Sequence, residues 1–131
     1  MIKIGTDIIE IARVKKAIQK PRFLEKIYTP KEIELIKKKG AKTAAANFAA
    51  KEAVAKALGN GFATTTPKDI EILRKTTGEP FVNLNTPQKN DIDIKISLSH
   101  SKEYAVAMVL IELKPWGVAP HPTGGIAPRP Q

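Results

Sequence analysis

The sequence has no cysteine among its 131 residues, and aromatic residues make up only 5% of it. The absence of cysteine excludes a disulfide framework, thiol catalysis and thiolate metal sites. No apolar run reaches the roughly eighteen residues that indicate a membrane-spanning helix. The first residues also lack the apolar segment and the small-residue cleavage site of a secretory signal. We therefore expect a cytoplasmic protein with no membrane span.

Several familiar functional signatures are also missing. The chain has no zinc-ligand spacing, and it has no glycine-rich phosphate loop of the Walker or Rossmann type. Its few aromatic residues are not interleaved with the basic ones, so the sequence gives little support for stacking on single-stranded nucleic acid. The function has to be sought in the charge distribution and in a few local motifs.

Basic residues are concentrated in the first third of the chain. Residues 1–42 hold 12 of the 22 lysines and arginines and 5 of the 13 acidic residues, and the whole chain has a formal net charge of +9. Such an excess favours an anionic partner, which includes nucleic acid, acidic lipid and an acidic protein. The alternative is a solvated surface that serves only solubility.

Hydrophobic spacing predicts a mixture of helices and strands. Residues 2–9 have the isoleucine content of a buried strand, and residues 12–20 have the spacing of an amphipathic helix with a basic outer face. The sequence Thr29-Pro30-Lys31-Glu32 is a capping box that starts the next helix. The remaining expected elements are a helix over 43–58, a hairpin of 69–74 and 81–84, strands over 91–98 and 104–113, and a turn at 99–102. We expect one domain over 1–113 and a Pro/Gly-rich tail over 114–131.

Two carboxylates lie in otherwise apolar or alanine-rich elements. Asp7 is on the first strand and Glu52 is on the long helix, with Lys56 one turn further along the same helical face. Burying an unpaired charge costs several kcal/mol, so two such acids indicate a cation held between them. Hard oxygen ligands favour Mg²⁺ completed by water and phosphate oxygens. The alternative for Glu52 and Lys56 is an ordinary surface pair worth roughly 0.3–0.5 kcal/mol.

A third motif follows the strand at 91–98. It places His100 between Ser99 and Ser101, and its imidazole could bind a phosphate or relay a proton. The alternative is a turn whose serine and histidine side chains satisfy nearby backbone groups. A hydrolase pair is not indicated, because adjacent residues seldom face each other and no nucleophile elbow is present.

Three motifs together resemble the small class of 4′-phosphopantetheinyl transferases, the holo-acyl-carrier-protein synthases. They are GTDIIEIAR at 5–13, FAAKEAVAKALG at 48–59 and SLSHSKEYA at 97–105. The resemblance covers about residues 1–113. It implies an α+β fold with an antiparallel sheet packed against a long central helix. It also implies Mg²⁺-dependent transfer of the phosphopantetheine arm of coenzyme A to a serine of apo acyl carrier protein, for fatty acid biosynthesis.

The resemblance also implies roles for individual residues. Asp7 and Glu52 match the magnesium ligands, and the catalytic set is Asp7, Glu52, Lys56 and His100. Coenzyme A contacts fall to Lys56, Gly59, Ser99 and His100, and docking of the acidic carrier protein falls to Arg13, Lys16 and Arg22. The general base stays open between a metal-bound water, Glu52 and His100.

One residue departs from the family pattern, and the size of the chain adds a further expectation. Asn47 stands where many relatives have an arginine, which weakens any contact that this arginine makes. The body is half the size of the larger transferase class, and the family forms trimers with sites at subunit interfaces, so a homotrimer is expected. Two functions of other classes remain as alternatives. One is a basic nucleic-acid-binding module that uses the helix at 12–20, with salt-sensitive affinity, and the other is a non-catalytic scaffold.

Overall fold

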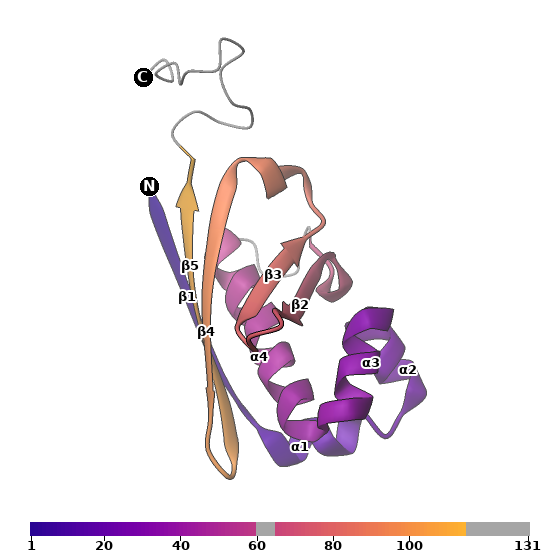
Figure 1. The fold of residues 1–131 in the computed structure, drawn as a ribbon. Helices are drawn as coiled ribbons and strands as arrows, with labels where there is room; N and C mark the ends of the chain where they lie inside the picture. The colour runs from indigo at the N-terminus through magenta and orange to yellow at the C-terminus, as the bar shows by residue number, and fades with distance from the viewer. Residues whose placement is uncertain (60–64, 115–131) are drawn as a thin grey trace.

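The computed structural model describes residues 1–59 and 65–114, and its centre is a long helix packed on one face of a three-stranded antiparallel sheet (Figure 1). The strands are β1 (Ile2–Glu10), β4 (Ile92–His100) and β5 (Tyr104–Leu113), and β5 lies between the other two. The long helix is α4 (Ala41–Leu58). The expected α+β fold, with an antiparallel sheet against a long central helix, is confirmed.

Smaller elements surround the other sides of α4. Helices α1 (Ile11–Ala17), α2 (Pro21–Ile27) and α3 (Pro30–Lys39) gather at one end, and α3 begins with the predicted capping box of Thr29 and Glu32. The predicted hairpin is formed by β2 (Ile70–Arg74) and β3 (Pro80–Leu84) as a separate two-stranded sheet. Two short 3₁₀ helices, η1 (Pro67–Asp69) and η2 (Pro87–Asn90), precede β2 and β4.

Small residues allow α4 to lie close to its neighbours. Most of its alanines are buried, and the residue opposite them on β1 is Gly5. A Cβ atom placed on Gly5 would lie 2.0 Å from the carbonyl oxygen of Ala53, far inside any allowed contact. A larger residue at position 5 would push β1 away from α4, and with it Asp7 two residues later.

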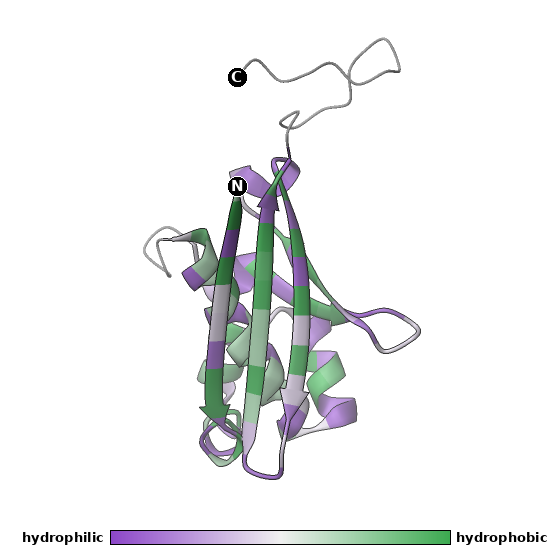
Figure 2. Cartoon of the chain, turned by 90° about the vertical axis from the view of Figure 1, so that its left-hand side faces the viewer, coloured by the Kyte–Doolittle hydropathy of each residue, from purple (hydrophilic) through white to green (hydrophobic). Residues whose placement is uncertain are grey.

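The first strand is not buried, contrary to the sequence-based expectation. Ile4 and Ile8 are 63% and 62% exposed, because α4 covers only one face of the sheet and these side chains point to the other. Figure 2 shows this open face with apolar bands along β1 and β5. The exposed apolar residues of these strands are Ile2, Ile4, Ile8, Tyr104, Val106 and Met108, and we call them the open apolar face.

The expected turn at 99–102 is also shifted. Ser99 and His100 are still in β4, where they pair with Val106 and Ala105 of β5. The reversal begins at Ser101, whose Oγ accepts hydrogen bonds from the backbone N–H groups of Glu103 and Tyr104. Apart from Lys114, the expected tail at 114–131 lies outside the described residues. Within the described ranges, no helix has the length and apolar character needed to cross a membrane.

Candidate active site

Asp7, Glu52 and Lys56 meet where β1 passes over the second half of α4. Alternation along β1 turns Asp7 to the same face as Gly5, toward the helix. The Nζ of Lys56 donates to Asp7 Oδ1 at 3.0 Å and to the backbone oxygen of Thr6 at 3.1 Å. Lys56 therefore pairs with the acid of another element, and the simple surface pair of Glu52 with Lys56 is not the arrangement found.

The electrostatics of Glu52 show that Asp7 lies close enough to act on it. Partial burial raises the pKa of the Glu52 carboxyl, the negative charge of Asp7 raises it further, and Lys56 opposes both effects. Two carboxylates in this position repel each other unless a cation lies near them. Lys56 supplies one positive charge from a side chain that is about half exposed, so the ammonium group remains accessible from solvent.

The donor set fits Mg²⁺ when a substrate supplies part of the coordination. Within the described residues there is no group of three or more His, Cys, Asp or Glu side chains that could hold a metal ion. Two carboxylates are what Mg²⁺ commonly takes from a protein, with waters and phosphate oxygens in the other positions. The residues that could hold the ion are Asp7 and Glu52. Gly59 closes α4 just beyond Lys56 with a positive φ of 97°, at the same end of the helix.

His100 and Ser99 do not join this group within one chain. His100 lies on the face of β4 that is turned toward α4, but at the opposite edge of the sheet from β1. It borders a cavity of about 220 Å³, and Asp7, Glu52 and Lys56 are not among the residues that line this cavity. Ser99 is exposed on the other face of β4, opposite Val106. A single chain thus separates the two halves of the expected site.

Two residues that contact the hairpin or its neighbours, Lys51 and Arg74, escaped the sequence analysis. Lys51 is fully buried beside Glu52, and its Nζ donates to Glu32 Oε1 at 2.7 Å. Arg74 of β2 reaches Asn47 of α4, and its Nη2 donates to Asn47 Oδ1 at 2.9 Å. For Lys51, the only signal in the sequence was a lysine at a position of the alanine-rich helix that is otherwise apolar. No local pattern marks the contact of Arg74 with Asn47, because 27 residues separate them in the sequence.

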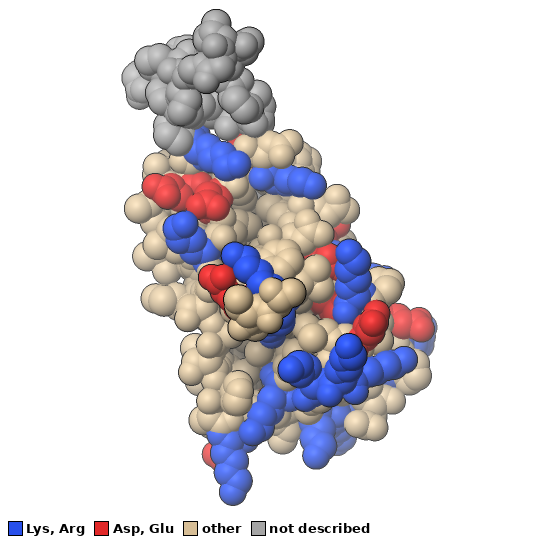
Figure 3. Space-filling model, viewed as in Figure 1, with Lys and Arg blue, Asp and Glu red and all other residues tan. Residues whose placement is uncertain are grey.

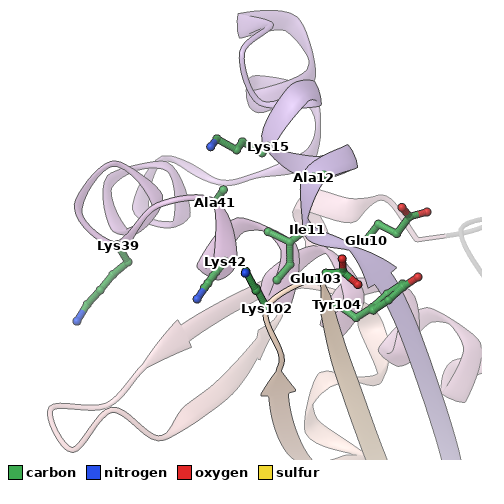
Figure 4. A pocket seen from close by; sticks show the side chains of 10 residues that line it. All are labelled: Glu10, Ile11, Ala12, Lys15, Lys39, Ala41, Lys42, Lys102, Glu103 and Tyr104. Carbon is green, nitrogen blue, oxygen red and sulfur yellow. The ribbon is translucent and has the colours of Figure 1, made fainter.

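A wider hollow lies elsewhere, at the end of the sheet near α1. It has a volume of about 590 Å³ and does not include the two carboxylates. Figure 4 shows Lys39, Lys42 and Lys102 on one side of it, and Glu10 and Tyr104 on the other. Lys102 comes from the turn between β4 and β5. The fold therefore places a lysine that is distant in sequence next to the basic N-terminal region.

The residues expected to dock a carrier protein are all on the surface. Arg13 and Lys16 are exposed on α1, three residues apart and thus on one helical face, and Arg22 is exposed at the start of α2. In Figure 3, lysine and arginine side chains crowd the end of the molecule formed by α1, α2 and α3, with few acidic residues among them. The predicted basic outer face of the first helix is confirmed, but the helix ends at Ala17 rather than at residue 20.

Comparison with known proteins places this architecture among enzymes of one kind. The sequence model of the 4′-phosphopantetheinyl transferase superfamily matches residues 3–109. The chain is 48% identical over 120 residues to a holo-[acyl-carrier-protein] synthase of Clostridium beijerinckii, an alignment that covers 86% of this chain and 98% of the relative. A relative with the same name from Fusobacterium nucleatum is 45% identical, with 85% and 98% covered.

Solved structures agree with the sequence matches. A holo-(acyl-carrier-protein) synthase of Bacillus anthracis, in complex with CoA (3′,5′-ADP), superposes with a TM-score of 0.77 and 36% identity over 86% of this chain and 96% of that one. The Helicobacter pylori synthase in complex with coenzyme A gives a TM-score of 0.75 and 36% identity, with 83% and 99% covered. The likeness therefore extends over nearly the whole of these proteins.

Proposed function

The chain belongs to the 4′-phosphopantetheinyl transferase superfamily, among the holo-[acyl-carrier-protein] synthases, and on this premise we propose that it transfers the phosphopantetheine arm of coenzyme A to a serine of an apo acyl carrier protein. The observation that carries the proposal is the meeting of Asp7, Glu52 and Lys56 beside β1. We place the reaction in the cytoplasm, where it would serve fatty acid biosynthesis. The comparisons favour the transferase over the nucleic-acid-binding and scaffold alternatives.

In this reaction the serine oxygen forms a bond to the phosphorus next to the pantetheine. The bond from that phosphorus to the oxygen bridging the diphosphate breaks, and adenosine 3′,5′-bisphosphate leaves while the serine proton passes to a base. Asp7 and Glu52 would hold Mg²⁺, which supplies charge neutralisation for the diphosphate when bound. Lys56 adds a positive charge, and its hydrogen bond to Asp7 holds the ammonium group in place. The site therefore needs less reorganisation as negative charge develops on the phosphate oxygens.

A direct assay tests the proposed reaction. The protein is incubated with coenzyme A, Mg²⁺ and several apo carrier proteins, and each carrier is weighed by mass spectrometry. We expect a mass gain equal to one phosphopantetheine arm, lost when EDTA removes the metal. No gain with any carrier would contradict the transferase assignment.

We further propose a homotrimer with active sites at the subunit interfaces. The carboxylate pair and the His100 cavity lie at opposite edges of the sheet, so a ring of subunits can bring the β1 edge of one against the β4 edge of the next. Rings form through such unlike surfaces. The open apolar face gives the apolar area that such contacts require, since isolated soluble chains rarely expose a large apolar patch.

A charge on the open apolar face should break the assembly and with it the activity. We expect Met108→Glu to shift the protein from trimer to monomer in light scattering after size exclusion, and to remove most of the turnover. Met108 is 54% exposed in one chain, so the substitution should be tolerated by the isolated fold. Lys89→Glu on η2 is the control and should remain a trimer. A Met108→Glu trimer of full activity would contradict the assembly.

We also propose that the acidic carrier protein docks on the basic surface around α1, through Arg13, Lys16 and Arg22. Replacing a basic residue there by an acidic one should slow the encounter of the enzyme with the acidic carrier protein. We expect Arg13→Glu to raise the KM for the carrier about tenfold at low salt, with a smaller effect as salt rises because the Debye length shortens. The KM for coenzyme A should not change. Lys89→Glu again serves as the control, and an equal effect of both variants on carrier KM would argue against docking at α1.

A further inference from the structure

The cavity beside His100 is lined by three basic side chains and by no acidic one. It lies between the start of α4, the β2–β3 hairpin and the end of β4, and Lys42, Arg74 and His100 come from these three parts. The other lining residues are Thr43, Ala46, Gly78, Pro80 and Leu98. Its volume is about 220 Å³, well above the roughly 10–15 Å³ that one water needs. The cavity is therefore large enough for a small anionic group.

Arg74 is held in place by neutral partners. Its Nη2 donates to Asn47 Oδ1 at 2.9 Å, and its Nη1 donates to the backbone oxygen of Leu73 at 3.3 Å. Among the described residues, no carboxylate forms an ion pair with it. A guanidinium has five N–H donors, so most of them remain to be used by a ligand.

The acid whose charge acts on Arg74, Glu32, already has other partners. Glu32 accepts hydrogen bonds from Lys51 Nζ, from Asn47 Nδ2 and from the backbone N–H of Ile72, so it has little capacity left for a further cation. Partial burial lowers the pKa of Arg74, while the charge of Glu32 opposes this. A half-buried guanidinium beside a lysine, with no carboxylate partner, gains stability when an anion enters.

We propose that Arg74 is a phosphate-binding residue of this enzyme and that it directs its guanidinium, anchored on Asn47, into the cavity shared with Lys42 and His100. The inference rests on the proposed function, because the phosphate groups that would enter the cavity are those of the proposed substrate, coenzyme A. Asn47 stands at the position where the family pattern has an arginine, and Arg74 brings a guanidinium to the tip of that shorter side chain. Both the 3′-phosphate and the diphosphate of coenzyme A are anionic groups that a guanidinium can bind.

Calorimetric titration of the full chain tests the proposal. We expect Arg74→Met to weaken coenzyme A binding roughly ten- to a hundredfold, the range for one charge-assisted hydrogen-bonding partner. 3′-Dephospho-coenzyme A distinguishes the two phosphate sources. If Arg74 binds the 3′-phosphate, the analogue binds wild type and Arg74→Met equally, and if Arg74 binds the diphosphate, the analogue shows the same loss as coenzyme A. Both outcomes support phosphate binding by Arg74.

Lys75→Met is the matched control, since Lys75 is the next residue, carries the same charge and pairs with the exposed Glu79. It should bind coenzyme A as wild type does. Equal affinity of Arg74→Met and wild type, or an equal loss in both variants, would overturn the proposal. Absence of coenzyme A binding by the wild type would instead contradict the proposed function itself.

A second measurement does not depend on the stability of Arg74→Met. The side-chain Nε–H resonance of Arg74 in the wild-type protein is assigned from the spectrum of Arg74→Lys and followed by NMR during a coenzyme A titration. We expect this resonance to shift as coenzyme A saturates the protein. An unchanged Arg74 resonance at saturation would overturn the inference.

Discussion

Replacing Asp7 by asparagine, or Glu52 by glutamine, is expected to lower turnover by about 10²–10⁴-fold. Each change removes one negative charge at nearly constant shape and leaves one carboxylate to hold the cation. Metal stabilisation of a transition state is worth several kcal/mol, and each 1.4 kcal/mol is about a factor of ten. Initial rates of arm transfer, measured over a range of Mg²⁺ concentrations, give both the loss of turnover and the expected rise in the metal requirement.

The fold should survive these substitutions. The ion pair of Asp7 with Lys56 is partly exposed, and such pairs contribute at most about 1 kcal/mol. Asp7→Asn also removes the repulsion that Asp7 exerts on Glu52. The melting temperature should therefore stay within a few degrees of that of the wild type.

The matched control is Glu10→Gln, which removes an acid of the same strand whose side chain is exposed on the opposite face. It should keep wild-type turnover and metal dependence. Normal turnover in Asp7→Asn and Glu52→Gln would show that these acids do not hold the metal, and an equal loss in Glu10→Gln would show that the rate responds to net charge rather than to this pair.

Local patterns were sufficient to predict most elements. The alanine-rich run gave α4, the capping box gave the start of α3, and alternation in β1 turned Asp7 away from Glu10. These features depend on residues a few positions apart. The expectation that Asp7 and Glu52 act together came from a different argument, the cost of leaving two acids unpaired in apolar elements.

The features that local patterns did not predict depend on which surfaces meet. Alternation showed that Ile4 and Ile8 share a face, but not that α4 covers the other one. The spacing of Glu52 and Lys56 suggested a pair along the helix, whereas Lys56 turns to Asp7 because β1 crosses there. The contact of Arg74 with Asn47 requires the hairpin to be folded onto α4. Such tertiary contacts leave no signal in short-range periodicity.

Lys51 and Glu32 form a buried ion pair whose hydrogen bonds join four parts of the fold. The three donors of Lys51 Nζ reach Glu32 Oε1 at 2.7 Å and the backbone oxygens of Pro67 and Ile70 at 2.8 and 2.6 Å. Glu32 also accepts from the backbone N–H of Thr29 at the start of α3. Burial lowers the pKa of Lys51 and the charge of Glu32 opposes this, so Glu32 helps to keep Lys51 charged.

Lys51→Met is expected to destabilise the protein by about 3–5 kcal/mol, since it leaves the buried Glu32 charge without its cation. Glu32→Gln should cost a similar amount, because it leaves Lys51 without a counter-ion. The free energy of unfolding is measured by urea titration at one fixed protein concentration, since association of subunits adds to apparent stability. The double variant should lose clearly less than the sum of the two single losses, because the second substitution removes the unpaired charge that the first creates.

The exposed pair of Lys75 with Glu79 provides the control for this cycle. Its side chains are 55% and 62% exposed, and Lys75→Met should change the free energy of unfolding by less than about 1 kcal/mol. The contrast tests burial itself, since both pairs join a lysine to a glutamate at close to 3 Å. If Lys51→Met cost no more than Lys75→Met, or if the two buried losses were simply additive, the pair would not be what fixes the hairpin and α3 on the central helix. The hairpin would then be held on α4 by other contacts, among them the hydrogen bond from Arg74 to Asn47.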